Sequence, residues 1–404
     1  MKISSIKIIS VIFFFILFVD SSMIGLSSTV GGWINNALSL LLLWIFRDDC
    51  RRFIFVEKNK VGLLLLLYCV ICVYSVYLNK EFISQIDAQA MVEGTKLRIE
   101  GNTRISSVIY PSIGIITALV FIKRMIEEDK IQIVIRTLTL CMGILVFLIN
   151  YDAFTMDDVE SGAGYIVRDK FYVCYYNLFL CVLFYLGHPK LRHASKLVFL
   201  FLCLMMFAVS MHTKCSTMVI GTVIFGTLTI LFSNRWKSHL YNMKVLFIVL
   251  FLCDIFFFFF IYRLLQIPSV QDFLVNVLHE DITLTGRVFI YAEIQKVLID
   301  SPYFGYGFGN SFIITEYFIN APNVQNGLGD LFLQVGIVGC LCFLCILYLL
   351  FKPIEKQNYN VFPVVAFIYT MLVVSMVEIP FNNRFLFFSF FLLIPSSVFQ
   401  HKRI

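Results

Sequence analysis

The residues best suited to chemistry lie in a polar segment, residues 263–330, of an otherwise apolar chain. Arg287 follows Thr285-Gly286 and begins an expected helix, so the free N–H groups of that helix start add to the positive field of its side chain. Such a helix start is suited to binding an anion. Three side chains that could exchange a proton lie eight or fewer residues before Arg287: His279, Glu280 and Asp281.

A second cation, Lys214, lies where two expected spans are joined with almost no loop. Its neighbours between Ser210 and Thr217 are small and hydroxylated, which favours a polar pocket at the membrane boundary. The alternative is a lysine that extends to lipid headgroups. Asp254 is the only acid deep in an apolar run, and we expect it to face a partner inside the bundle.

Glycines and two short helices should shape the polar segment. Residues 271–278 read as a short amphipathic helix, and the helix from Arg287 should end before Ser301-Pro302. The glycine cluster that follows lets backbone pass close to a substrate or to another loop. Its members are Gly305, Gly307 and Gly309. Beyond the polar turn 323–327, Gly336 and Gly339 should permit close helix packing.

The composition indicates the elements that must position these groups. With 59% hydrophobic residues, 14% charged residues and a mean hydropathy of +0.86, the chain is predicted to be an all-α polytopic membrane protein. We expect about twelve transmembrane helices, grouped as 1–262 (spans 1–9), a large extracytoplasmic loop 263–330, and 331–404 (spans 10–12). The expected spans are 5–22, 27–46, 61–78, 105–122, 131–149, 171–187, 197–213, 215–232, 245–262, 331–351, 361–378 and 385–400.

The charge distribution predicts the orientation of these spans. With both termini cytoplasmic, the cytoplasmic segments hold 20 Lys/Arg against 7 Asp/Glu and the outer segments 11 against 18, while Arg136 and Asp254 lie inside spans. This asymmetry follows the positive-inside rule. The asymmetry places residues 263–330 outside. The net charge of +6 is therefore explained by the orientation of the spans and does not indicate nucleic-acid binding.

Metal and redox chemistry are not indicated. The twelve cysteines fall almost entirely in or beside apolar spans, where they read as small buried hydrophobes. Asp157-Asp158 is the pattern closest to a divalent-metal site, but a carboxylate pair on a solvated loop is usually just solvated. We therefore expect no metal and no cofactor.

Several short motifs together resemble the O-antigen ligase/polymerase superfamily. That family carries a Gly-Arg, a Gly-Tyr-Gly stretch and a His-Asn in its large outer loop, and a Ser-Arg element at the preceding helix hairpin. The similar residues here are Gly286-Arg287, Gly305-Tyr306-Gly307, Gln325-Asn326 and the stretch from Ser210 to Lys214. The resemblance covers roughly residues 205–345. It implies a bacterial inner-membrane glycosyltransferase acting on glycans carried by undecaprenyl diphosphate.

Two departures from the family pattern matter, and the second favours one activity within the family. Lys214 stands where an arginine is usual, which replaces bidentate diphosphate binding by a point charge. Gln325 stands where ligases carry a histidine proposed as the base, and glutamine cannot accept a proton at neutral pH. We therefore expect a polymerase of O-antigen or capsule repeat units. The alternatives are an O-antigen ligase acting on lipid A core and, from another class, a flippase for lipid-linked oligosaccharides.

The resemblance also implies roles and partners. Arg287 and Lys214 should bind the diphosphate, and a base should come from His279, Glu280 or Asp281. Further substrate-binding residues are expected to be Arg98, Arg104, Arg168, Gly305, Gly307, Gln325 and Asn326. The expected partners are the bilayer, a lipid-linked oligosaccharide as donor and another as acceptor, and a chain-length regulator protein as a further candidate.

Overall fold

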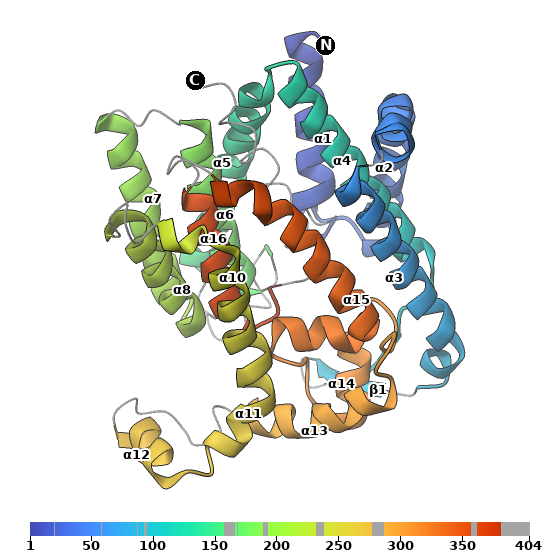
Figure 1. Cartoon of the computed structure of the whole chain (residues 1–404), viewed down its shortest axis with the longest axis vertical. Coiled ribbons are helices and arrows are strands. Elements are labelled where there is room, and N and C mark those ends of the chain that lie inside the picture. The colour runs from blue at the N-terminus through green and yellow to red at the C-terminus, as the bar shows by residue number, and fades with distance from the viewer. Residues whose placement is uncertain are drawn as a thin grey trace.

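The chain folds as a bundle of helices with a smaller helical region at one end (Figure 1). The computed structural model describes residues 1–19, 21–57, 59–86, 88–92, 95–156, 166–167, 169–188, 193–231, 238–276, 287–356 and 362–380. The helices of the bundle are α1 (Ile3–Phe18), α2 (Ser28–Arg51), α3 (Lys60–Gln85), α4 (Ser106–Glu127), α5 (Ile131–Thr155), α6 (Lys170–Gly187), α7 (His193–His212), α8 (Ser216–Gly226), α10 (Met243–Leu250), α11 (Phe257–Leu264), α15 (Gly327–Phe351) and α16 (Phe362–Val374).

The remaining elements are short. The smaller region contains α12 (Pro268–Asn276), α13 (Arg287–Asp300) and α14 (Ser311–Ile319), with an antiparallel hairpin of β1 (Ala88–Val92) and β2 (Thr95–Ile99) nearby (Figure 1). Short 3-10 or π-helical turns are η1 (Ser21–Ile24), η2 (Arg52–Val56), η3 (Thr227–Leu231), η4 (Phe251–Phe256) and η5 (Lys352–Lys356). The hairpin was not predicted; it occupies part of the expected loop between the third and fourth spans.

Among the described residues, seven helices are long and apolar enough to cross a membrane. They cover residues 29–56, 60–85, 106–127, 131–155, 170–187, 195–212 and 327–354. Shorter apolar helices cover 3–18, 216–230 and 362–374. These helices indicate a multi-pass helical membrane protein, as the composition predicts. The expected total of twelve spans stays a prediction, since the last of them, 385–400, lies outside the described residues.

Contacts between helix ends define two opposite faces of the bundle. At the first, which we call the N-terminal face, the Met1 ammonium pairs with Glu128 at 2.9 Å and Arg124 pairs with Asp49 at 2.7 Å. The opposite end carries α12, α13, α14 and β1, and we call it the loop face (Figure 1). Since α4 runs between the two faces with 22 residues, they lie about 33 Å apart.

The polar segment has a hydrophobic core of its own. On α13, the side chains of Tyr291 and Ile294 are fully buried, and Val297 and Leu298 nearly so. They pack with Phe258 of α11 and with apolar residues of α14 in one cluster. This confirms the predicted helix from Arg287 and its buried face. The described part of segment 263–330 is therefore a folded region and not a simple connector.

The glycine cluster joins this region to a break in α15. Gly336 has φ +63° inside α15, and a side-chain carbon there would lie 2.3 Å from the backbone of Tyr303. The N–H groups of Tyr306 and Gly307 donate across the break to the carbonyls of Leu333 and Gln334. The prediction that Gly336 serves helix–helix packing was therefore wrong: this position admits a non-helical backbone and a neighbouring loop, which a Cβ would exclude.

Candidate functional site

The side chain of Arg287 reaches the end of another helix on the loop face. Arg287 is the first residue of α13, where the N–H groups of the first turn have no partner within the helix. Its Nη2 lies 3.5 Å from Oε1 of Glu378, in the turn that follows α16. The two side chains are 24% and 12% exposed. Their pairing places an ion pair, mostly shielded from solvent, where the folded loop region meets the bundle.

Glu378 is surrounded by further charged and titratable groups. It interacts electrostatically with Asp169 and Lys170 at the start of α6, and with Cys215 at the start of α8. Burial raises the pKa of Glu378 to about 8, although the positive charge of Arg287 acts in the opposite direction. A carboxyl group with a pKa near neutrality can exchange protons at physiological pH.

Sequence reasoning did not single out Glu378. In the sequence it is only an acid at the end of an apolar run, and its charge contributed only to the predicted orientation of the spans. Nothing local links it to Arg287, because the two residues are 91 positions apart.

Lys214 occupies a strained turn between α7 and α8. Its φ is +50°, in the left-handed region that favours glycine. The N–H of Cys215 donates to the carbonyl of Ser210 and the N–H of Lys214 to that of Met211, which is the Schellman pattern of a helix end. A non-glycine residue in such a position is uncommon and more often found where the side chain has a function.

The hydroxyl groups beside Lys214 are used by the fold. Those of Ser210 and Thr213 are buried and donate to the carbonyls of Met206 and Val209. The side chain of Lys214 is exposed. These two hydroxyls therefore serve the helix pair, and the polar pocket expected around this lysine stays a prediction.

Packing of α8 on α16 brings this turn to the level of Glu378. A side-chain carbon at Gly221 would lie 3.1 Å from Val374, and Cys215 at the start of α8 interacts electrostatically with Glu378 beyond the end of α16. Cys215 precedes Gly221 by six residues and Glu378 follows Val374 by four. Both positions thus lie beyond this contact in the direction of the loop face, by about 6–9 Å. The turn with Lys214 and the Arg287–Glu378 pair consequently share one side of the molecule.

Gln325 and Asn326 lie beside the same pair. The hydroxyl of Tyr291, one turn after Arg287, donates to the carbonyl of Gln325 at 2.6 Å. Gln325 has φ +52°, and its side-chain oxygen is buried without a hydrogen-bond partner in the part of the chain described. Asn326 is fully buried and caps α15, since its side-chain oxygen accepts from the N–H of Gly329. Gln325 thus offers an unused acceptor, whereas Asn326 is engaged by the fold.

Asp254 is buried in the bundle, as predicted, but the partner expected for its carboxylate is not found among the described residues. It lies in the π-helical turn η4, and its carboxylate is directed toward the Ser375 side chain and the N–H of Leu328 without a hydrogen bond within normal limits. The amide of Asn326 donates to the Asp254 carbonyl at 3.4 Å. The positive start of α15 therefore compensates this carboxylate.

A second group of predicted residues lies around the glycine cluster. Gly305 abuts the backbone of α15 at Leu333, and its carbonyl accepts from Asn79 of α3. Gly307 lies against the side-chain amide of Asn310, which also bonds the backbone of Asn102. Arg104 is exposed two residues further on. These residues meet one another here but not the Arg287–Glu378 pair, so their substrate contacts stay predictions.

The other predicted site residues cannot be placed in the same way. Arg98 lies in β2 opposite Gln89. Arg168 and the three candidate bases lie outside the described residues. The three bases are His279, Glu280 and Asp281. No set of three metal-ligating side chains occurs within the described ranges, and independence from metals stays a prediction.

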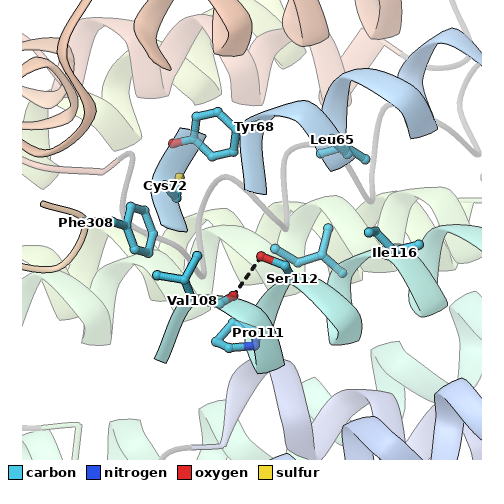
Figure 2. A pocket seen from close by; sticks show the side chains of 9 residues that line it. Leu65, Tyr68, Cys72, Val108, Pro111, Ser112, Ile116 and Phe308 are labelled. Carbon is cyan, nitrogen blue, oxygen red and sulfur yellow. Dashed lines mark hydrogen bonds between the residues drawn. The ribbon is translucent and has the colours of Figure 1, made fainter. Parts of the chain in front are cut away.

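An apolar pocket lies elsewhere, between α3 and α4 (Figure 2). Phe308 of the glycine cluster lies at one side of it. Ser112 in its lining donates its hydroxyl to the carbonyl of Val108. The lining offers hydrocarbon contacts but no charged group: Leu65, Tyr68, Cys72, Val108, Pro111, Ser112, Ile115, Ile116 and Phe308. We therefore place the candidate chemistry at Arg287 and Glu378.

No protein-family model matches this chain, and no curated protein matches it.

Proposed function

We propose that this protein is a polysaccharide polymerase. It transfers a growing glycan from undecaprenyl diphosphate to the non-reducing end of another lipid-linked repeat unit, of O-antigen or capsule type. The observation that carries the proposal is the position of Arg287: it begins a helix on the loop face, is mostly buried, and shares that side with the Lys214 turn. This arrangement is suited to an anion at the membrane boundary.

The reaction requires charge compensation more than covalent chemistry from the protein. When the bond between sugar and diphosphate breaks, the diphosphate leaves with the electron pair and gains charge. Arg287 stabilises that charge with a planar set of N–H donors, one of which, Nε, is buried without a partner among the described residues. Lys214 adds a point charge at the boundary. By analogy with the loss of a single oxyanion-hole donor, each cation contributes about 2.7–4 kcal/mol to the transition state.

Gln325 favours polymerase over ligase. By the resemblance it stands where ligases carry a histidine, and it lies beside Tyr291 in the same cluster as Arg287. Its amide can hold a sugar hydroxyl through the unused side-chain oxygen, but it cannot take a proton. The acceptor is therefore bound at this position and deprotonated by another group.

The glycan pattern of a deletion strain tests this proposal. A polymerase deletion leaves single repeat units attached to the final acceptor and removes all longer chains. Complementation with the wild-type chain restores the long chains, and Lys296→Ala, which removes an exposed cation from the same helix α13, restores them equally. Loss of all attached glycan would identify a ligase instead, and an unchanged pattern would exclude both activities.

A further inference from the structure

We propose that Glu378 is the catalytic base of this site, accepting the proton of the acceptor hydroxyl once a diphosphate has bound Arg287. This inference rests on the proposed function and adds the identity of the proton acceptor. It differs from the expectation drawn from the sequence, which placed the base at His279, Glu280 or Asp281.

The geometry of the ion pair supports this role. Glu378 is the carboxylate that contacts Arg287 in the described structure, through a single interaction of 3.5 Å. That distance is at the upper limit of a hydrogen bond, so the contact is weak. A phosphate oxygen can therefore replace Glu378 at Arg287 and leave the carboxylate next to the reacting diphosphate. Because its side chain is 12% exposed, a substrate hydroxyl can reach it while bulk water is largely kept away.

The proton and electron changes balance without a further reactant. The acceptor O–H bond breaks and its proton moves to Oε of Glu378. The acceptor oxygen forms a bond to the anomeric carbon, and the bond from that carbon to the diphosphate oxygen breaks. The electron pair leaves with the diphosphate, next to Arg287. Glu378 ends the step as a neutral carboxylic acid and returns its proton to water afterwards.

The surroundings of Glu378 set its basicity. The groups that face it are Arg287 and Tyr291 from α13, Asp169, Lys170 and Tyr175 from α6, and Cys215 from α8. Burial and the charge of Asp169 raise the pKa of Glu378, whereas Arg287 and Lys170 lower it. Binding of a diphosphate to Arg287 offsets its positive charge, so the carboxylate becomes a stronger base when the donor is present.

Kinetics of the full-length protein in proteoliposomes test the inference. The substrate is a repeat unit linked to undecaprenyl diphosphate, and elongation by the wild-type protein is the reference. Glu378→Gln should lower kcat by about 10²–10⁴-fold, the usual contribution of a general base, with little change in KM. Glu378→Asp should retain part of the activity. Glu293→Gln, the same change on the outer side of α13, should match wild type.

The pH profile provides a test that does not need an inactive variant. In wild type, kcat/KM should rise with pH through about 8, the pKa of Glu378. Asp169→Asn should move this rise to lower pH, because Asp169 raises the pKa of Glu378 while asparagine still caps α6. A wild-type profile without the rise would overturn the inference.

The outcomes separate the two proposals. Absence of elongation by wild type would overturn the proposed function itself. Elongation by wild type together with full kcat in Glu378→Gln would overturn only the assignment of the base. A raised KM with unchanged kcat in that variant would also overturn it, since Glu378 would then act only by positioning Arg287.

Discussion

Arg287 Nη2 lies 3.5 Å from Glu378 Oε1, and this pair joins the start of α13 to the turn after α16. The folded loop region and the bundle thus meet at two opposite charges that are both mostly buried. Removing Arg287 would leave the ionised Glu378 carboxylate without its positive partner, which is costly in such surroundings. The predictions below use this relationship and the strained turns around it.

Arg287 should be required for elongation. Arg287→Ala removes the donors for the diphosphate and should leave single repeat units only. Arg287→Lys keeps the charge but not the planar fork, so it should shorten the chains sharply at normal expression. Glycan length in a complemented deletion strain measures both effects. A residue that merely anchors the loop to lipid headgroups would tolerate lysine, and wild-type chain lengths from both variants would refute the assignment.

Glu378→Gln should stabilise the protein while inactivating it. The pKa of Glu378 is raised from 4.5 to about 8 in the folded state, so the fold favours the protonated form. The stability of wild type therefore falls as pH rises from 4.5 through 8, whereas glutamine does not ionise. The free energy of unfolding of Glu378→Gln should exceed that of wild type by an amount that grows over this interval to roughly a few kcal/mol. Thermal unfolding at pH 5 and pH 8 measures it, with Glu293→Gln as the control that shows no such trend.

Lys214→Gly should separate stability from activity. The left-handed backbone of Lys214 favours glycine by about 1 kcal/mol, so the variant should unfold at a higher temperature. It lacks the cation and should not elongate the glycan. Lys214→Arg should keep activity, and Lys214→Ala should lose it without loss of protein. If Lys214→Gly elongates normally, the lysine only extends to the headgroups.

Gly336→Ala should disrupt the break in α15. Its Cβ would lie 2.3 Å from the backbone of Tyr303, and φ is +63°. Neither backbone segment can move without a large energetic cost, so we expect the free energy of unfolding to fall by an amount on the order of 3 kcal/mol. Gly32→Ala is the matched control, because it lies inside α2 with open space around it and should be neutral or slightly stabilising. Thermal unfolding in detergent compares the two, and equal midpoints would contradict the role of Gly336.

The loop face should lie outside the cell membrane. Pro322 is exposed at this face and Asp129 is exposed in the turn at the N-terminal face. A membrane-impermeant thiol reagent applied to cells with a permeable outer envelope should label Pro322→Cys but not Asp129→Cys. The wild-type protein measures background labelling of its own cysteines. Labelling of Asp129→Cys alone would reverse the orientation predicted from the charge distribution.

Local signals in the sequence were enough for several elements. The apolar runs predict membrane-spanning helices, because a bilayer admits backbone only where its hydrogen bonds are satisfied internally. The start of α13 at Arg287 and its end before Ser301 follow from residues a few positions apart. The turn that leads into α15 at Asn326 is similarly local. In each case the deciding interactions lie within one or two helical turns.

Only the tertiary structure decided which side chains meet. Glu378 reaches Arg287 because α16 ends at the level where α13 begins, and that level depends on how α8, α16 and the core of the loop region pack. The break at Gly336 depends in the same way on the backbone of residues 302–307, which fits only against a residue without a Cβ. Contacts between segments far apart in the chain arise from packing of whole helices, and no short stretch of sequence encodes that packing.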